Sequence, residues 1–327
     1  FSLVNSVLLS PLPYDSPERI MTVEPLWTNT GQTNTVSSAP DFRDWRDQNH
    51  VFEYMAFHAG REVRVVANGT PIFAAVQLVT PDFFNVFGVR SFRGRLWTEA
   101  EETSPLAVVS HAWASSQFGE AASAIGQRIE VVGRSAEIVG VASPGFTYPA
   151  STDMWLSSAL IPINQNRGGH NYFVVGKLKP GVGVDEARAD MRVIAARLEQ
   201  EYPANRFKSV AVTPMLDKLT NRAQTTLWLL FGTVIGVMLI ACVNVANLQM
   251  ARAAARGREM AVRSAIGAGP GRLGRQVLTE NLVLGFVGCL VGLMFGWFTL
   301  KVFLAVAPPD IPRLDEVHIN GRVLLFT

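Results

Sequence analysis

Two long runs without charged side chains constrain this chain more than any other feature. Between Arg222 and Arg252 lie 29 residues with no Asp, Glu, Lys or Arg, and between Glu280 and Lys301 lie another 20. A hydrocarbon core about 30 Å thick is crossed by roughly 20 apolar helical residues. Both runs meet that length, which favours membrane helices over buried helices of a soluble protein. Transmembrane helices are therefore expected at 225–250 and 277–307.

Charge is distributed unevenly along the chain. Residues 1–222 carry 20 Lys or Arg and 22 Asp or Glu, whereas residues 251–280 carry six Arg and two Glu. Basic residues in short loops stay on the cytoplasmic side of a membrane. Residues 251–276 are therefore the predicted cytoplasmic segment, and the polar region 15–222 is predicted to lie outside. The net charge of +2 averages over unlike parts, and without a long basic tract it predicts no nucleic-acid partner.

Both ends of the sequence are apolar. Residues 1–10 have the pattern of the last turns of a membrane helix, and residues 308–327 run from a polar loop into a new apolar stretch. We interpret the sequence as a fragment of a longer polytopic protein. The first segment is then the end of a first transmembrane helix, and the last is an outer loop with the start of a truncated helix.

Residues 15–222 mix strand and helix patterns, and we call this region the outer domain. Asn68-Gly69 between two apolar runs predicts a hairpin, preceded by separate strands over Phe52–Ala59 and Glu62–Ala67. A second hairpin is predicted across Gly133-Arg134. The expected fold is an α+β extracytoplasmic domain joined to an α-helical transmembrane domain.

Two helices of the outer domain are predicted from their patterns. Pro40–Gln48 has Ser38 or Ala39 near its N-cap and a proline in its first turn. Asp185–Gln200 has one apolar face at helical spacing, and charged residues cover the other face. That apolar face consists of Ala187, Met191, Ile194, Ala195 and Leu198.

The sequence contains no recognisable active site. Its five histidines are scattered, and no spacing of His, Cys and carboxylate residues matches a metal site. A nucleophile elbow and a P-loop are both absent from the sequence. We therefore expect no catalytic, cofactor-binding or metal-binding residues.

Glycines recur at four-residue spacing in both apolar runs. This spacing places them along one stripe of a helix, where the backbone of another helix can approach closely. For the first pair, the general abundance of glycine in membrane helices is an equally good explanation. The predicted helix-packing residues are Gly232, Gly236, Gly285, Gly288, Gly292 and Gly296.

The basic connector predicts a short helix lying across the cytoplasmic ends of the two membrane helices. Arg256, Glu259 and Arg263 fall on one helical face, and Glu259 precedes Arg263 by four residues, the favourable order for an ion pair. Gly267 to Pro270 then ends this helix. Composition alone leaves open whether the connector does more than fix the orientation of the chain.

A family resemblance favours a larger role for the connector. The run REMAVRSAIGA at 258–268 resembles the signature of the FtsX-like permease domain, found in the MacB, FtsX and LolC class of ABC transporter permeases. Asn244–Leu248 resembles the duplicated-permease branch of that class. The outer domain is similar to the MacB-like periplasmic core domain at Leu9–Tyr14, Thr80–Phe84 and Gly181–Val184.

The resemblance implies a permease of the mechanotransmission type, which moves its periplasmic domain for export or cell-envelope work. A separate ATPase would bind ATP and Mg²⁺ and hydrolyse the ATP, so this chain would need no cofactor and would not be an enzyme. The implied ATPase-coupling residues are Arg258, Glu259, Met260, Arg263, Ile266, Gly267 and Ala268.

The same resemblance implies a multi-pass protein of the plasma (inner) membrane with its large domain outside. The expected partners are an ABC ATPase subunit, membrane lipid and a second permease unit or half that forms a dimer, with a periplasmic adaptor as a further candidate.

Two other classes of membrane protein are alternatives: a sensory receptor with an extracytoplasmic ligand-binding domain, and a membrane-anchored envelope hydrolase. A receptor requires a cytoplasmic signalling domain after the membrane helix, whereas this chain is predicted to re-enter the membrane within about 30 residues.

Overall fold

The computed structural model describes residues 12–265 and 270–306 of the 327-residue chain. The chain divides into two compact units, Pro11–Leu219 and a second unit comprising Phe1–Ser10 and Thr220–Thr327. The first unit contains nearly all of the predicted outer domain, and it keeps that name below. The predicted helix end at 1–10 and the predicted loop and helix start at 308–327 lie outside the described residues.

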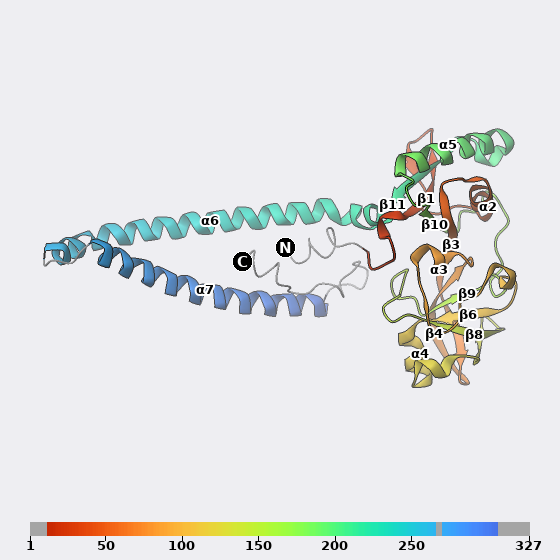
Figure 1. The fold of residues 1–327 in the computed structure, drawn as a ribbon, viewed down its shortest axis with the longest axis horizontal. Helices are drawn as coiled ribbons and strands as arrows, with labels where there is room; N and C mark the ends of the chain where they lie inside the picture. The colour runs from red at the N-terminus through yellow and green to blue at the C-terminus, as the bar shows by residue number, and fades with distance from the viewer. Residues whose placement is uncertain (1–11, 266–269, 307–327) are drawn as a thin grey trace. The chain divides into compact units, whose positions relative to one another are not determined.

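The first lobe of the outer domain is an antiparallel sheet with the strand order β11-β1-β10-β3 (Figure 1). Each of two β-helix-β units contributes one helix, α2 in the first and α5 in the second. Taken in chain order the four strands are arranged 4-1-3-2, which is the split βαβ arrangement of ferredoxin-like folds. The bounds are β1 (Ile20–Trp27), the short β2 (Gln32–Thr33) paired with β1, α2 (Ala39–Gln48), β3 (Phe52–Ala67), β10 (Phe173–Leu178), α5 (Val184–Glu201) and β11 (Lys208–Pro214).

The second lobe is inserted between β3 and β10. Its pairings run from β3 through β4, β9, β6, β8 and β7 back to β3, so these six strands form a closed ring without a free edge. β5 pairs with β8 beside the ring. The bounds are β4 (Thr70–Val79), α3 (Phe83–Phe87), β5 (Ser91–Gly94), β6 (Leu106–Val109), α4 (His111–Phe118), β7 (Arg128–Val131), β8 (Arg134–Ala142) and β9 (Met154–Leu156).

Strand β3 belongs to both lobes. Its residues 52–58 pair with β10, and its residues 58–67 pair with β4. The prediction of two separate strands over Phe52–Ala59 and Glu62–Ala67 is therefore wrong. Gly60 pairs with Gln77 of β4, and the ladder continues through it instead of ending there. A Cβ on residue 60 would lie 2.2 Å from Nε2 of Gln77. The missing side chain makes room for Gln77 across the strand.

The two predicted hairpins are present, and one of them needs a correction. Asn68 and Gly69 connect β3 to β4 with φ values of 51° and 76°, as a type I′ turn requires. The second turn lies one residue earlier than predicted, at Val132-Gly133, with φ values of 50° and 75°. Arg134 is the first residue of β8 and pairs with Val131, so the two left-handed turn positions fall before it.

The predicted helices of the outer domain are confirmed. The Ser38 side chain caps α2 by accepting from the Asp41 backbone N–H, and Ser110 caps α4 in the same way. The five predicted apolar residues of α5 are all buried: Ala187, Met191, Ile194, Ala195 and Leu198.

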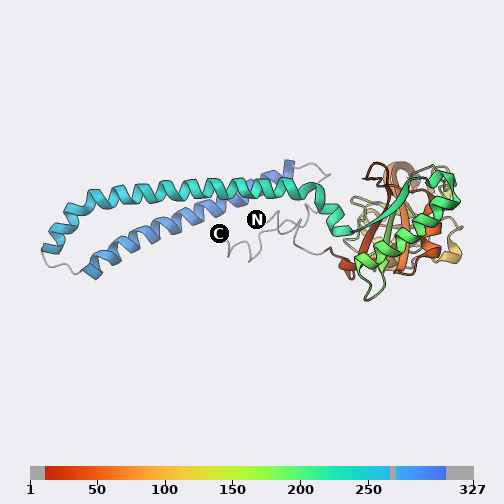
Figure 2. The same cartoon turned by 90° about the horizontal axis from the view of Figure 1, so that it is seen from above.

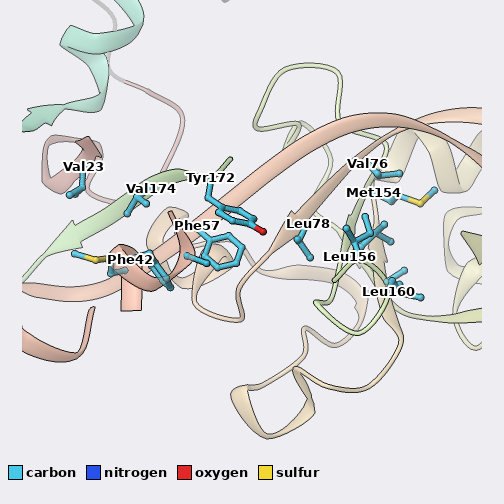
Figure 3. Close-up of a cluster of buried hydrophobic side chains, with 14 of the residues drawn as sticks. Val23, Phe42, Phe57, Val76, Leu78, Met154, Leu156, Leu160, Tyr172 and Val174 are labelled. Carbon is cyan, nitrogen blue, oxygen red and sulfur yellow. The ribbon is translucent and has the colours of Figure 1, made fainter. Parts of the chain in front are cut away.

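One buried apolar cluster extends through both lobes (Figure 3). In the first lobe the ring of Phe57 on β3 lies 4.5 Å from the ring of Tyr172, measured between centroids, and 5.0 Å from that of Phe42 on α2. In the second lobe the cluster includes Val76, Leu78, Met154, Leu156 and Leu160. Full burial of one such side chain contributes about 1.5–3 kcal/mol to the free energy of unfolding. Because the cluster has members in both lobes, its apolar packing stabilises both.

The second unit contains two long helices, α6 (Met215–Ala265, which begins in the outer domain) and α7 (Pro270–Val306), each drawn as one coil in Figure 2. Within the described residues, Gly232–Gly257 is the one segment long and apolar enough to span a membrane, and Gly285–Thr299 is a shorter apolar stretch. The prediction of a separate short helix in the connector is wrong, because residues 251–265 continue α6. Their sequence, rich in Ala and Arg, favours helix and contains no proline.

We expect Gly140→Ala to destabilise the second lobe. A Cβ on Gly140 of β8 would lie 2.1 Å from the backbone carbonyl oxygen of Arg95, which cannot move away without shifting the neighbouring chain. Such overpacking costs about 1–3 kcal/mol. Gly183→Ala is the control, because no atom lies within 4 Å of a Cβ there and the change at this N-cap costs under about 1 kcal/mol. Urea unfolding followed by circular dichroism measures both, and equal losses would contradict the expectation.

Candidate functional site: the coupling segment and the polar anchors of the outer domain

The predicted coupling residues are only partly described. The last turns of α6 contain four of them, Arg258, Glu259, Met260 and Arg263. These residues follow the apolar segment Gly232–Gly257, and their backbone is helical. Ile266, Gly267 and Ala268 lie outside the described residues. The four-residue separation of Glu259 and Arg263 in a continuous helix places both on the same face. Their role in coupling stays a prediction.

The predicted packing glycines are located on the two long helices. Gly232 and Gly236 belong to α6, and Gly285, Gly288, Gly292 and Gly296 belong to α7. In the described part of the chain, no atom lies within 4 Å of a Cβ built on Gly232, Gly236, Gly285, Gly288 or Gly292. The space beside these glycines is therefore open, and their packing role also stays a prediction.

The end of the outer domain is attached to its sheet by an ion pair. Met215, the first residue of α6, is fully buried, and it follows the last pair of the β1–β11 ladder, Met21 with Pro214. One turn later, Nζ of Lys218 donates to Oε2 of Glu24 on β1 over 2.6 Å. The Glu24 side chain is only 6% exposed. The first turn of α6 is thereby joined to the sheet by both apolar burial and charge.

The beginning of the outer domain has a matching attachment. Nζ of Lys177 on β10, itself buried, donates to Asp15 over 2.9 Å. The hydrogen bond and the charge of Lys177 lower the pKa of Asp15 below its ordinary value. Four residues later, Nε of Arg19 donates to the carbonyl oxygen of Leu178 over 2.8 Å, and the Arg19 guanidinium also pairs with Glu53. The entry into the domain is thus attached to β10 and β3, and the exit from it is attached to β1 of the same sheet.

A second polar centre, the Asp41 cluster, lies inside the first lobe. The fully buried Asp41 carboxylate on α2 accepts from Nζ of Lys208 and Nδ2 of Asn205, each over 3.0 Å, and from Arg167 over 2.7 Å. The Arg167 guanidinium also pairs with Asp44 over 2.6 Å and lies 3.8 Å from the Tyr202 ring centroid. These contacts join α2, β11, the turn after α5 and the loop before β10.

The electrostatics of the Asp41 cluster indicate a structural role. Burial alone would raise the pKa of Asp41, but the charge of Lys208 and hydrogen bonds from Asn205, Lys208 and Arg167 outweigh burial and lower it. Asp41 is therefore ionised, and its acceptor capacity is used by neighbouring donors. A carboxylate held in this way does not offer free acceptor sites for a metal or a substrate.

Sequence reasoning did not single out these polar contacts. Lys218 and Glu24 are 194 residues apart, and Lys208 and Asp41 are 167 residues apart. The sequence shows charged residues near the ends of the domain, but it does not indicate which residues pair with them. Among the described residues there is no cluster of three His, Cys, Asp or Glu side chains that could hold a metal ion.

Comparisons with known proteins cover most of the chain. The family model described as MacB-like periplasmic core domain matches residues 1–194, and the model described as FtsX-like permease C-terminal matches residues 231–319. No curated protein matches the sequence.

Solved structures of two extracytoplasmic domains are similar to this chain. The periplasmic region of MacB from Actinobacillus actinomycetemcomitans has 14% identity and a TM-score of 0.47, and the match covers 63% of this chain and 92% of that one. The extracellular domain of the noncanonic ABC-type transporter YknZ from Gram-positive bacteria has 14% identity and a TM-score of 0.45, with 59% and 99% covered.

We expect Asp41→Ala to destabilise the outer domain by about 3–5 kcal/mol, because it leaves the buried Lys208 and the largely buried Arg167 without their shared carboxylate. Asp47→Ala on the same helix is the matched control, since Asp47 is exposed and its loss costs within about 0.5 kcal/mol. Urea denaturation of both variants checks the difference. An Asp41→Ala variant as stable as the control would show that the cluster is not structurally important.

Proposed function

The chain belongs to the family of ABC transporter permeases that join a MacB-like periplasmic core domain to an FtsX-like permease domain, and we propose that it couples ATP hydrolysis by a separate ATPase to movement of its periplasmic domain. Members of this family lie in the inner membrane with that domain outside. The observation that carries the proposal is the order of the two family matches along one chain, with α6 leading from the outer domain into the second match. Export or other work on the cell envelope is the resulting activity.

The path of α6 supports mechanical coupling. It begins at Met215 in the core of the outer domain, contains the apolar segment Gly232–Gly257 and continues to Ala265, past four of the predicted coupling residues. Residues 215–265 contain no proline, so the backbone hydrogen-bond ladder has no forced break. A displacement at the coupling residues is then carried along the helix to Lys218, and through Glu24 to strand β1.

The absence of charge in the membrane segments supports work delivered outside the bilayer. Neither 223–251 nor 281–300 contains an Asp, Glu, Lys or Arg, whereas paths for ions or polar solutes through helix bundles are marked by such residues. We propose that substrate does not pass between these helices and is instead acted on by the outer domain. ATP and Mg²⁺ are held by the ATPase subunit, because this sequence has no P-loop.

The proposed assembly contains further components. The chain crosses the membrane more than once, with 277–307 as the second span, and it works as a dimer of permease units or of permease halves. A second helix bundle supplies the backbones that approach the open glycine stripes of α6 and α7. Membrane lipid surrounds the remaining apolar surface, and a periplasmic adaptor is a candidate partner of the outer domain.

Charge reversal in the coupling segment tests the proposal. We expect Glu259→Lys or Arg263→Glu, in the protein reconstituted with its ATPase in lipid vesicles, to lower ATPase binding and the ATP-dependent movement of the outer domain by roughly tenfold. Arg192→Glu, on the exposed face of α5, is the control. Combining both reversals restores an ion pair within the helix but not contacts to the ATPase, so the double variant should stay defective. Normal binding and coupling in the single variants would overturn the assignment of these residues.

A second prediction concerns the anchor between α6 and the sheet. Lys218→Glu places two carboxylates together at a buried position, and we expect it to reduce movement of the outer domain while ATPase binding stays normal. The exchange Glu24→Lys with Lys218→Glu restores opposite charges and should recover most of the movement. Labels on the outer domain measure the movement, and pull-down of the ATPase measures binding. A Lys218→Glu variant with full movement would show that this ion pair does not transmit force.

A further inference from the structure

His58 occupies the position at which β3 changes partners. It is paired with Phe173 of β10 in the first lobe and with Val79 of β4 in the second lobe. Any change in the angle between the two lobes must alter the backbone near this residue, because β3 is the strand that they share. The His58 side chain is only 4% exposed.

Residues from four different segments enclose the His58 ring. The Phe173 ring on β10 is stacked on it with centroids 5.2 Å apart, and the rings of Phe83 on α3 and Tyr148 stand edge-on at 5.6 and 5.4 Å. The side-chain oxygen of Gln77 on β4 lies 3.2 Å from Nδ1, and the Tyr148 hydroxyl lies 3.4 Å from Nε2. The ring therefore joins the first lobe, through β10, to three segments of the second.

The neutral form of His58 satisfies both ring nitrogens. With the Gln77 oxygen facing Nδ1, that nitrogen carries the proton and donates, and Nε2 accepts from the Tyr148 hydroxyl. A second proton would place a positive charge among three aromatic rings and a neutral amide. Burying such a charge without a counter-ion is costly.

The titratable and charged groups facing His58 do not supply that counter-ion. Tyr148 is neutral, because burial raises its pKa far above neutrality. On the sheet face bearing His58, Glu24 is paired with Lys218, and Lys177 of β10 is paired with Asp15. Tyr14 contacts the Tyr148 ring, and Glu62 of β3 is exposed. The Asp82 carboxylate before α3 accepts a hydrogen bond from Asn85. Burial accordingly lowers the pKa of His58 to about 4, although the Gln77 hydrogen bond acts in the opposite direction.

From this geometry we propose that His58 is an acid-sensitive switch between the two lobes of the outer domain: protonation of its ring separates it from Phe173 and Tyr148 and changes the angle between the lobes. The inference concerns the outer domain alone and does not depend on ATP-driven coupling. Because the family places this domain outside the inner membrane, its His58 junction is exposed to the acidity of the surroundings rather than to cytoplasmic pH.

The direction of the pH dependence follows from proton linkage. In the closed junction the pKa is about 4, whereas an open, hydrated ring has the ordinary value of 6.5. The open form therefore binds protons more readily between these values, and the closed form loses stability as the pH falls from about 6.5 towards 4. Between pH 6.5 and 4 the equilibrium shifts towards the open form by roughly 80-fold.

The test measures the distance between the lobes in the full chain in lipid nanodiscs. Spin labels are attached to Arg192→Cys on α5 and Phe73→Cys on β4, both exposed positions, after Cys242 and Cys289 have been replaced by serine. Double electron–electron resonance on samples frozen between pH 7.5 and 4.5 reports the distance distribution. We expect a second population to grow as the pH falls in the otherwise wild-type chain, and identical distributions throughout would overturn the proposal.

Two substitutions assign the response to His58. His58→Gln should abolish the pH dependence, whereas His50→Gln should leave it unchanged, because the His50 side chain is exposed at 84%. Gln77→Glu keeps the histidine and places a carboxylate beside Nδ1, which should raise the pKa of His58 in the closed junction towards the open-form value and so weaken or abolish the acid-induced opening. A response that persists in His58→Gln, or an acid-induced opening that is undiminished in Gln77→Glu, would overturn the assignment; the second variant decides even where the first does not fold.

Discussion

The outer domain depends on the backbone hydrogen bonds that β3 makes along its edges. One half of the strand completes the ferredoxin-like sheet by pairing with β10. The other half closes the ring of the second lobe by pairing with both β4 and β7. Neither lobe has a complete sheet without this strand. The insertion of 105 residues (68–172) between β3 and β10 is tolerated because it leaves from the end of β3 and leads into β10, which pairs with β3, so the first lobe keeps its order and its core.

Around this shared strand the polar contacts fall into two groups with different physical roles. The Asp41 cluster is buried and internally satisfied, so its contribution is to fix α2, α5 and β11 in one arrangement. Lys218 and Lys177 instead pair with carboxylates where the chain enters and leaves the sheet. A partly exposed ion pair can break and re-form at modest cost. The attachments therefore hold the ends of the domain less rigidly than the cluster holds the elements around Asp41.

Local patterns predicted the parts of this structure whose causes are local. The apolar face of α5 follows from helical spacing, the cap at Ser38 from side-chain chemistry, and the Asn68-Gly69 turn from the need for two left-handed residues. The continuity of β3 through Gly60 was missed because glycine in a strand usually signals a break, and only the position of Gln77 explains its presence.

Long-range contacts were beyond prediction from one sequence. Nothing within a few residues of Lys218 indicates that its partner is Glu24, and nothing near His58 shows that Phe173 and Tyr148 will enclose it. The coupling segment was instead predicted from a family signature, without any knowledge of contacts between residues. Its backbone continues α6 as far as Ala265 and resumes at Pro270 in α7.

The membrane-associated helices differ from the outer domain in what holds them. Apolar burial stabilises each lobe internally, but lipid is as apolar as a leucine side chain, so it gives helices no comparable reason to associate. Close backbone contact and van der Waals packing must replace that driving force, and glycine permits both. In the described residues no atom lies within 4 Å of a Cβ built on five of these glycines, which leaves room beside them for the backbone of another helix.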